Sequence, residues 1–147
     1  MLREFFEEKC RRDHALNECW IHLLEKWEHQ LTDELRLAFS RILNAHHIWN
    51  SRLQQQLPES EMTDLMPLSH WRKLQELNFR ETLNYLEDVV FDSKVHYHDS
   101  EGVRLEQTTV DMLFQLLQEN QFYRGQLALL FRQAALEAIP PAFGVLT

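Results

Sequence analysis

Residues 108–130 read TTVDMLFQLLQENQFYRGQLALL, and this stretch decides the fold. Thr108, followed three residues later by Asp111, resembles the capping box that begins a helix, with aspartate in place of the commoner glutamate. Apolar residues then recur at helical spacing. We expect a helix from this point to about Ala138, ended by the two prolines at 140–141.

The rest of the chain divides into segments of the same kind. Residues 58–67 form the first long polar connection, and the segments on either side of it carry apolar residues at helical spacing. We expect three further helices: Leu2 to about Gln30, a second that begins at Thr32 as N-cap and runs to about Gln55, and a third that begins at Ser69 as cap and runs to about Val89.

Residues 91–107 differ from these helical segments. Apolar and polar residues alternate on both sides of a turn sequence, Asp99-Ser100-Glu101-Gly102. The alternation predicts either a short β-hairpin or an extended crossover loop before the last helix. Together these segments predict an all-α protein, a four-helix bundle that occupies residues 1–147 as a single domain.

The composition supports a helical protein and excludes several functions. The chain has 147 residues and only 3 glycines, where average usage would give roughly ten, and strand-rich folds need turn glycines. Its net charge of −8 and the absence of a basic run argue against nucleic-acid binding. No apolar stretch is long enough for a membrane span, so no membrane partner is expected.

The two thiols and the first residues indicate a compartment. Cys10 and Cys19 are the only cysteines, and on one helix they would be about 13 Å apart, too far for a disulfide. The opening sequence MLREFFEEK has no apolar run of signal-peptide length. We therefore expect a reduced, cytoplasmic protein.

Three polar side chains interrupt the apolar faces of the expected helices. Glu119 and Tyr123 are one turn apart on the line that would face the core, and Arg41 lies in line with small and apolar residues of the second helix. An inward arginine and glutamate would need each other to offset the loss of hydration. The alternative is that they lie at the edge of the stripe and extend to water.

Two motifs resemble a known family. The segment Phe39-Ser40-Arg41-Ile42-Leu43-Asn44-Ala45-His46-His47-Ile48-Trp49-Asn50 resembles the second helix of the DinB superfamily of four-helix bundles. Residues 114–126, which end in Tyr123-Arg124-Gly125-Gln126, resemble its fourth helix. The resemblance covers nearly the whole chain in the right order, and it implies the DinB-like bundle and, in many members, a homodimer.

The usual site of that family is not retained here. It consists of three histidines that hold a divalent metal, and their positions correspond to Arg41, Glu119 and Tyr123. Gln115, where many relatives have another histidine, is also changed. Arginine cannot bind a metal, but it can form a two-pronged bond to a carboxylate. We therefore expect Arg41 to pair with Glu119, with Tyr123 as a hydrogen-bonding neighbour, in a pocket that Trp49 and Gln115 complete.

The remaining histidines are weaker candidates for metal ligands. His46 and His47 are adjacent, so on a helix they point in different directions. His96 and His98 alternate in the expected hairpin, a spacing that metals can use but that is usually just surface. On the first helix, Glu18 with His22 and Glu25 with His29 are expected to be solvated side-chain pairs.

Two functions follow from these observations. The first is a DinB-like protein that has lost its metal, needs no cofactor and acts as a non-catalytic binding or interaction protein. The second is a metal-dependent enzyme, a thiol S-transferase or hydrolase that acts on a small molecule and uses zinc or nickel, as the resemblance implies. A third hypothesis is that the pocket still binds a small molecule, with Arg41 as the residue that recognises an anion and Trp49 as an apolar wall.

The glycine in the second motif also needs an explanation. Gly125 lies inside the expected fourth helix, where glycine costs about 1 kcal/mol relative to alanine. We expect close helix packing to be the reason.

Overall fold

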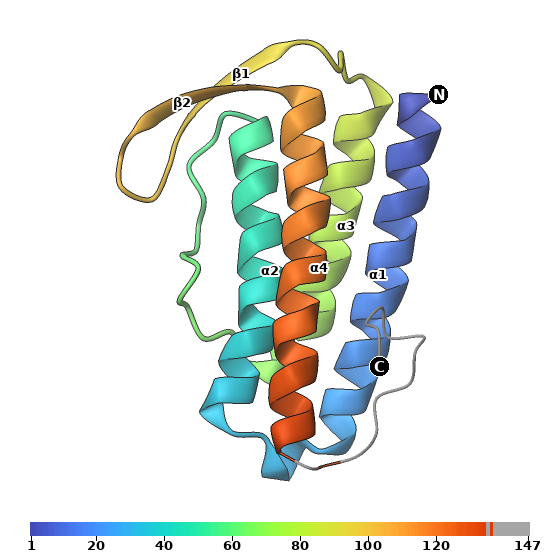
Figure 1. The fold of residues 1–147 in the computed structure, drawn as a ribbon, viewed down its shortest axis with the longest axis vertical. Helices are drawn as coiled ribbons and strands as arrows, with labels where there is room; N and C mark the ends of the chain where they lie inside the picture. The colour runs from blue at the N-terminus through green and yellow to red at the C-terminus, as the bar shows by residue number, and fades with distance from the viewer. Residues whose placement is uncertain (135, 137–147) are drawn as a thin grey trace.

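Four α-helices lie side by side in the computed structural model, which describes residues 1–134 and 136 (Figure 1). They are α1 (Leu2–Lys26), α2 (Asp33–Leu53), α3 (Trp71–Glu87) and α4 (Thr109–Gln133). Two short 3-10 turns, Glu28–Gln30 and Leu68–His70, precede α2 and α3. Strands β1 (Lys94–His98) and β2 (Arg104–Thr108) come directly before α4. The prediction of a mostly helical chain is confirmed.

The predicted N-caps of α2 and α4 are both present. The Thr32 hydroxyl accepts a hydrogen bond from the backbone N–H of Leu35 at 3.2 Å. The Thr108 hydroxyl accepts one from the backbone N–H of Asp111 at 3.3 Å. Each threonine thereby satisfies one of the backbone donors that a helix leaves without a partner at its start.

The predicted cap of the third helix is wrong. Ser69 lies inside the 3-10 turn Leu68–His70, and α3 begins only at Trp71, without a side-chain cap. The backbone N–H of His70 donates to the carbonyl of Pro67 at 2.9 Å, which closes this tighter turn before the α-helix begins.

The segment before α4 is a β-hairpin, and the alternative of an extended crossover loop is wrong. β1 and β2 are antiparallel, with Lys94 opposite Thr108. The Asp99 carboxylate accepts the backbone N–H groups of Glu101 and Val103, both at 2.9 Å. Gly102 adopts φ +81°, a left-handed conformation that favours glycine.

The core consists of two apolar clusters separated by polar residues. One cluster contains Trp20, Phe39, Trp71 and Phe131, and the other contains Phe6 and Met112. On every helix, buried polar residues lie between those of the two clusters. We call this set the polar layer: Asp13 and Asn17 of α1, Asn44 and His46 of α2, Gln75, Asn78 and Thr82 of α3, and Asn120 and Arg124 of α4.

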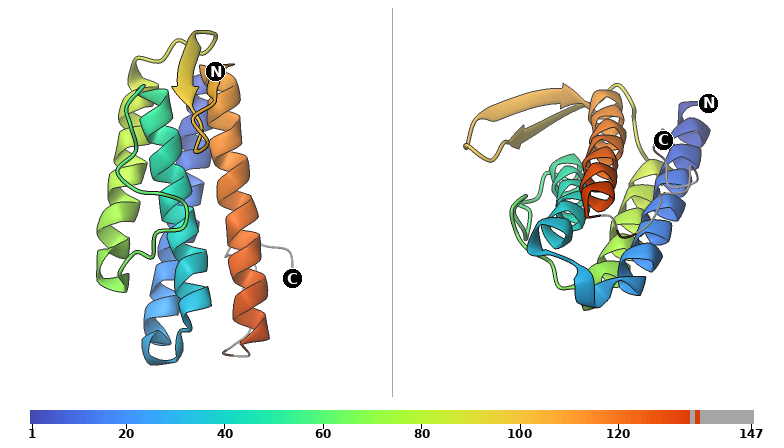
Figure 2. Two further views of the ribbon diagram at one scale, coloured as in Figure 1. Left: turned by 90° about the vertical axis from the view of Figure 1, so that its left-hand side faces the viewer. Right: turned by 60° about the horizontal axis from the view of Figure 1, so that its bottom comes forward.

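The helices and the connections between them have a definite arrangement. α2 packs most extensively against α4, and α3 packs against α1, whereas the contact between α1 and α4 is the smallest of the helix pairs in the ring. The connection at residues 54–67 runs along the side of α2 (Figure 2). It is fastened there because Asn44 donates to the carbonyl of Asp64 at 2.9 Å and the Ser40 hydroxyl accepts from the N–H of Met66 at 2.9 Å.

Two further sequence predictions concern membrane spans and the end of the last helix. None of the described helices is long and apolar enough to cross a membrane. The predicted end of the last helix, near Ala138 and the prolines at 140–141, lies outside the described residues.

Candidate functional site

The three residues predicted to form the site lie close together between α2 and α4. Arg41 comes from α2, Glu119 and Tyr123 come from α4, and all three are partly buried. The pKa of Tyr123 is raised, first by burial and then by the Glu119 carboxylate, while Arg41 lowers it. Tyr123 is therefore a protonated phenol at neutral pH, and the charges of Glu119 and Arg41 both act on its pKa.

Glu119 has a different partner from the one predicted. Its Oε2 accepts a hydrogen bond from the indole N–H of Trp49 at 2.6 Å. Within residues 1–134 and 136, no ion pair or hydrogen bond joins Arg41 to Glu119, so the predicted pair is not formed. The physical reason is that Trp49 is 3% exposed, and a buried indole N–H needs an acceptor. The Arg41 guanidinium has no partner among the described residues.

Residues of the hairpin close one end of this site. The Tyr97 hydroxyl donates to Gln107, whose amide in turn donates to Gln115 at 3.3 Å. The Tyr97 and Trp49 rings meet edge to face, with centroids 5.8 Å apart. The Arg52 guanidinium lies 4.8 Å from the Trp49 ring centroid and 4.9 Å from that of Tyr97. Trp49 is therefore buried, and its indole N–H holds Glu119 from inside the core.

His46 is buried as a neutral side chain. Asn50 donates its amide to the carbonyl of Asn78, so its Oδ1 must accept the Thr82 hydroxyl, at 2.7 Å. That hydroxyl has a single hydrogen, and His46 Nε2 must therefore donate to Thr82 at 2.8 Å. Burial, followed by the charges of His14 and of a neighbouring histidine, lowers the pKa of His46 to about 3.

The remaining histidines that were weighed as metal ligands are His47, His96 and His98. His47 Nε2 accepts the backbone N–H of Glu59 at 2.9 Å. His96 and His98 are exposed on β1, as expected for surface residues, and His96 lies 3.3 Å from the Glu106 carboxylate across the hairpin.

The charged pairs predicted within the first helix are wrong. Glu18 contacts His14, one turn earlier, instead of His22. Glu25 contacts Arg72 of α3 instead of a residue of its own helix. The packing of α3 beside α1 supplies partners across the interface that the spacing within one helix does not reveal.

These contacts create a cluster that the sequence analysis missed. Nε2 of His14 and carboxylate oxygens of Glu18 and Glu76 all lie within 4.8 Å of one another. The His14 ring stacks on Phe79, with centroids 4.1 Å apart and the planes nearly parallel. One imidazole and two carboxylates are ligand types that divalent transition metals accept.

The hydrogen bonds behind His14 fix where its proton lies. Arg124 can only donate, and it donates to Asn17 Oδ1 at 3.2 Å. The Asn17 amide therefore donates to Gln75 Oε1, and the Gln75 amide donates to His14 Nδ1, both at 3.1 Å. Nδ1 is thus an acceptor, and neutral His14 has its proton on Nε2, facing Glu18 and Glu76. A metal bound to Nε2 would require the proton on Nδ1 instead. The donor and acceptor in each of the hydrogen bonds from His14 to Asn17 would then have to exchange roles.

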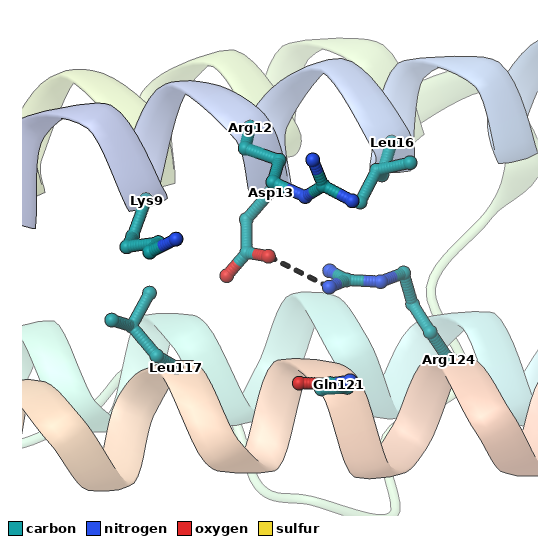
Figure 3. A pocket seen from close by; sticks show the side chains of 7 residues that line it. All are labelled: Lys9, Arg12, Asp13, Leu16, Leu117, Gln121 and Arg124. Atoms are coloured by element: carbon teal, nitrogen blue, oxygen red, sulfur yellow. Dashed lines mark hydrogen bonds and ion pairs between the residues drawn. The ribbon is translucent and has the colours of Figure 1, made fainter. Parts of the chain in front are cut away.

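A buried charge pair lies at the start of the same network. Arg124 Nη2 is 2.7 Å from Asp13 Oδ1, and both residues are buried between α4 and α1. They line a cavity of about 200 Å³ that opens between these two helices (Figure 3). Burial raises the pKa of Asp13, although Arg124 acts in the opposite direction.

The sequence contained a signal for this pair. Asp13 and Asn17 continue the helical spacing of Phe6 and Cys10 toward Trp20, so they belong to the buried stripe of α1. Counting only apolar residues hides such positions.

The glycine of α4 has a different setting from the one predicted. Gly125 is exposed, and a Cβ placed on it would meet nothing within 4 Å among the described residues. Close helix packing within this chain therefore does not explain it.

Comparisons of this chain with protein-family models, with curated proteins and with solved structures find no match.

Proposed function

We propose that this chain is a DinB-like bundle that has lost its metal and acts as a non-catalytic binding or interaction protein. The order of its elements supports the family assignment, because four helices with a β-hairpin directly before the last are what the resemblance implies. Arg41, Glu119 and Tyr123, at the three ligand positions, come from the two helices that would carry the metal ligands.

One observation carries the proposal: the Glu119 carboxylate is bound by the Trp49 indole, beside a free arginine and a protonated tyrosine. Arg41 has no lone pair to offer a metal. Tyr123 would have to lose its phenol proton to bind one as an anion, and the pKa of that phenol is raised. Only one negatively charged ligand remains, and a catalytic zinc site uses three protein ligands.

The same arrangement supports binding through Arg41. Its guanidinium is partly exposed and has no partner in the described part of the chain, so it can accept a carboxylate or phosphate group without breaking an internal contact. Arg41 is therefore the residue of this face that would recognise an anionic group on a ligand or partner.

A second copy of the chain is the partner that we propose. The resemblance implies a homodimer, and α4 exposes Phe122 and Leu129, seven residues apart on nearly one line of the helix. Apolar side chains in such a row are typical of helix-mediated association. Sedimentation equilibrium should give a dimer for the wild type and a monomer for Phe122→Glu, with Leu77→Glu, at an exposed apolar residue of α3, as the matched control. A monomeric wild type would contradict this part of the proposal.

The metal-dependent enzyme remains the second candidate because of His14, Glu18 and Glu76, whose ligand atoms lie together. In that case the metal would activate a thiol or a water by lowering its pKa. The proton order along the hydrogen bonds behind His14 favours the metal-free alternative.

Metal analysis decides between the two candidates. Protein purified without a histidine tag should contain far less than one equivalent of zinc or nickel, both as isolated and after incubation with each ion and desalting. One tightly bound equivalent would overturn the proposal. Glu76→Gln and Glu119→Gln would then locate the metal, because each removes a charged ligand from only one of the two clusters.

Arg41→Ala tests whether the arginine is structural. Because Arg41 has no ion-pair or hydrogen-bond partner among residues 1–134 and 136, the free energy of unfolding should change by less than about 0.5 kcal/mol. A loss of about 2 kcal/mol or more would assign Arg41 to a structural contact and remove the case for an anion-recognition residue.

A further inference from the structure

The cavity between α1 and α4 lies on a different side of α4 from Arg41 and Trp49. It has a volume of about 200 Å³. The hydrocarbon side chains of Leu16 and Leu117 form part of its wall, and Asp13 of α1 faces Arg124 of α4 across it (Figure 3). It opens between the two neighbouring helices that pack least extensively against each other.

The charges around this cavity do not balance. Lys9, Arg12 and Arg124 contribute three positive charges, and Asp13 contributes the single negative charge of the lining. Arg124 holds Asp13 at 2.7 Å, whereas neither Lys9 nor Arg12 forms an ion pair with any described residue. Two excess positive charges therefore surround one opening in a chain whose net charge is −8, and they favour an anionic guest.

Two buried polar atoms of the lining also have no partner. Arg124 Nε is a donor and Asp13 Oδ2 is an acceptor, and neither has a hydrogen bond among the described residues. Arg124 is 3% exposed. Buried polar groups are nearly always hydrogen-bonded. The two atoms belong to the two partners of one ion pair, so a single small guest that carries one acceptor and one donor could satisfy both.

We propose that this cavity binds a small organic acid that carries a hydroxyl or amino group next to its carboxylate. The carboxylate would accept from Arg124 Nε and lie near Lys9 and Arg12, and the adjacent hydroxyl or ammonium would donate to Asp13 Oδ2. The volume suits a small molecule, because a cavity of about 150 Å³ already holds one the size of benzene.

Nuclear magnetic resonance tests the proposal on the full chain. The side-chain Nε–H signal of Arg124, assigned through its own α4 backbone, is followed in ¹⁵N-labelled protein during titration with glycolate, acetate or inorganic phosphate. Glycolate has both the carboxylate and the donor, whereas acetate lacks the donor. We expect saturable shifts of this signal with glycolate, at least about threefold tighter binding than acetate, and weaker binding of phosphate.

Charge variants at the cavity mouth provide the matched comparison. Lys9→Gln with Arg12→Gln removes two cations from the lining and keeps the buried pair. Arg11→Gln with Lys73→Gln removes two exposed cations elsewhere. The first double variant should bind glycolate about tenfold more weakly, and the second should bind it within about twofold of the wild type.

Several results would overturn this inference. They are a shift that does not saturate, equal binding of glycolate and acetate, tighter binding of phosphate than of glycolate, or equal weakening by the two double variants. The inference does not depend on the metal-free function proposed above. A tightly bound zinc ion would overturn that function and leave the glycolate titration unaffected.

Discussion

The indole N–H of Trp49 donates to the Glu119 carboxylate at 2.6 Å and thereby ties α2 to α4 through a partly buried charge. The hydrogen bond occupies the one carboxylate among the three predicted site residues Arg41, Glu119 and Tyr123. It also joins two sequence motifs that lie 70 residues apart.

Trp49→Phe should destabilise the protein by about 1–3 kcal/mol, because it removes the donor and leaves a partly buried carboxylate without this partner. Urea unfolding measures the change. Glu119→Gln is the matched control, since its amide oxygen still accepts the indole N–H, and its loss should be clearly smaller. Equal losses for the two variants would mean that the negative charge of Glu119, and not a hydrogen bond that a neutral acceptor can also make, is responsible. The double variant Trp49→Phe with Glu119→Gln separates indole packing from the hydrogen bond, because a pure packing effect makes the two losses additive.

His46 should make the stability depend on pH. Its pKa is lowered to about 3 in the folded chain, against about 6.5 when unfolded. The unfolded chain therefore binds this proton first as the pH falls, so the stability from His46 is complete above pH 6.5 and declines between 6.5 and 3. Between pH 7 and pH 5 the decline should be about 2 kcal/mol.

His46→Gln should remove this component of the pH dependence, whereas the exposed His22→Gln should retain it. Urea unfolding of the wild type and both variants at pH 7 and pH 5 provides the comparison. An unchanged slope in His46→Gln would show that other groups cause the decline.

Gly125→Ala should stabilise the protein by about 0.5–1 kcal/mol. The position is helical and exposed, and an added Cβ meets no described neighbour, so alanine reduces the entropy of the unfolded chain without a clash. Gly102→Ala should have the opposite effect because Gly102 has φ +81°. Thermal unfolding distinguishes the two. A destabilised Gly125→Ala variant would indicate that something packs against this glycine.

The two cysteines should differ sharply in reactivity. Cys19 is exposed, whereas Cys10 is buried, and burial followed by the Asp13 charge raises the pKa of its thiol to about 12. At pH 8 only about one Cys10 thiol in ten thousand would be ionised. Iodoacetamide should therefore modify one site in the native wild type and none in Cys19→Ser until denaturant is added. Rapid modification of native Cys19→Ser would contradict the buried position of Cys10.

The helix boundaries could be predicted where a side chain marks them. Thr32 and Thr108 are caps because their hydroxyls reach a backbone donor three residues later, and that spacing is visible in the sequence. Ser69 also carries a hydroxyl group and comes shortly before a helix, yet it lies inside a 3-10 turn and does not cap the helix. Local spacing cannot decide this, because the turn depends on how Trp71 enters the core.

The candidate site was predicted only in part for a related reason. Arg41, Glu119 and Tyr123 do lie together, but the partner of Glu119 is Trp49, two turns further along α2. Helical periodicity gives the face of a residue and not the reach of a long side chain. Asn120 and Arg124, each one position after a predicted site residue, are more deeply buried than those residues. An error of one residue in the assumed centre of the stripe is enough to conceal them.

The polar layer determines how the helices are aligned along their length. Leucine-rich rows can interlock at several offsets that differ by one helical turn, about 5.4 Å. Such a slide of α4 along α1 would carry Arg124 away from Asp13 and into one of the apolar clusters, where an uncompensated charge costs several kcal/mol. The two clusters supply most of the driving force for folding, and the buried ion pair selects one register among packings that would otherwise be similar in energy.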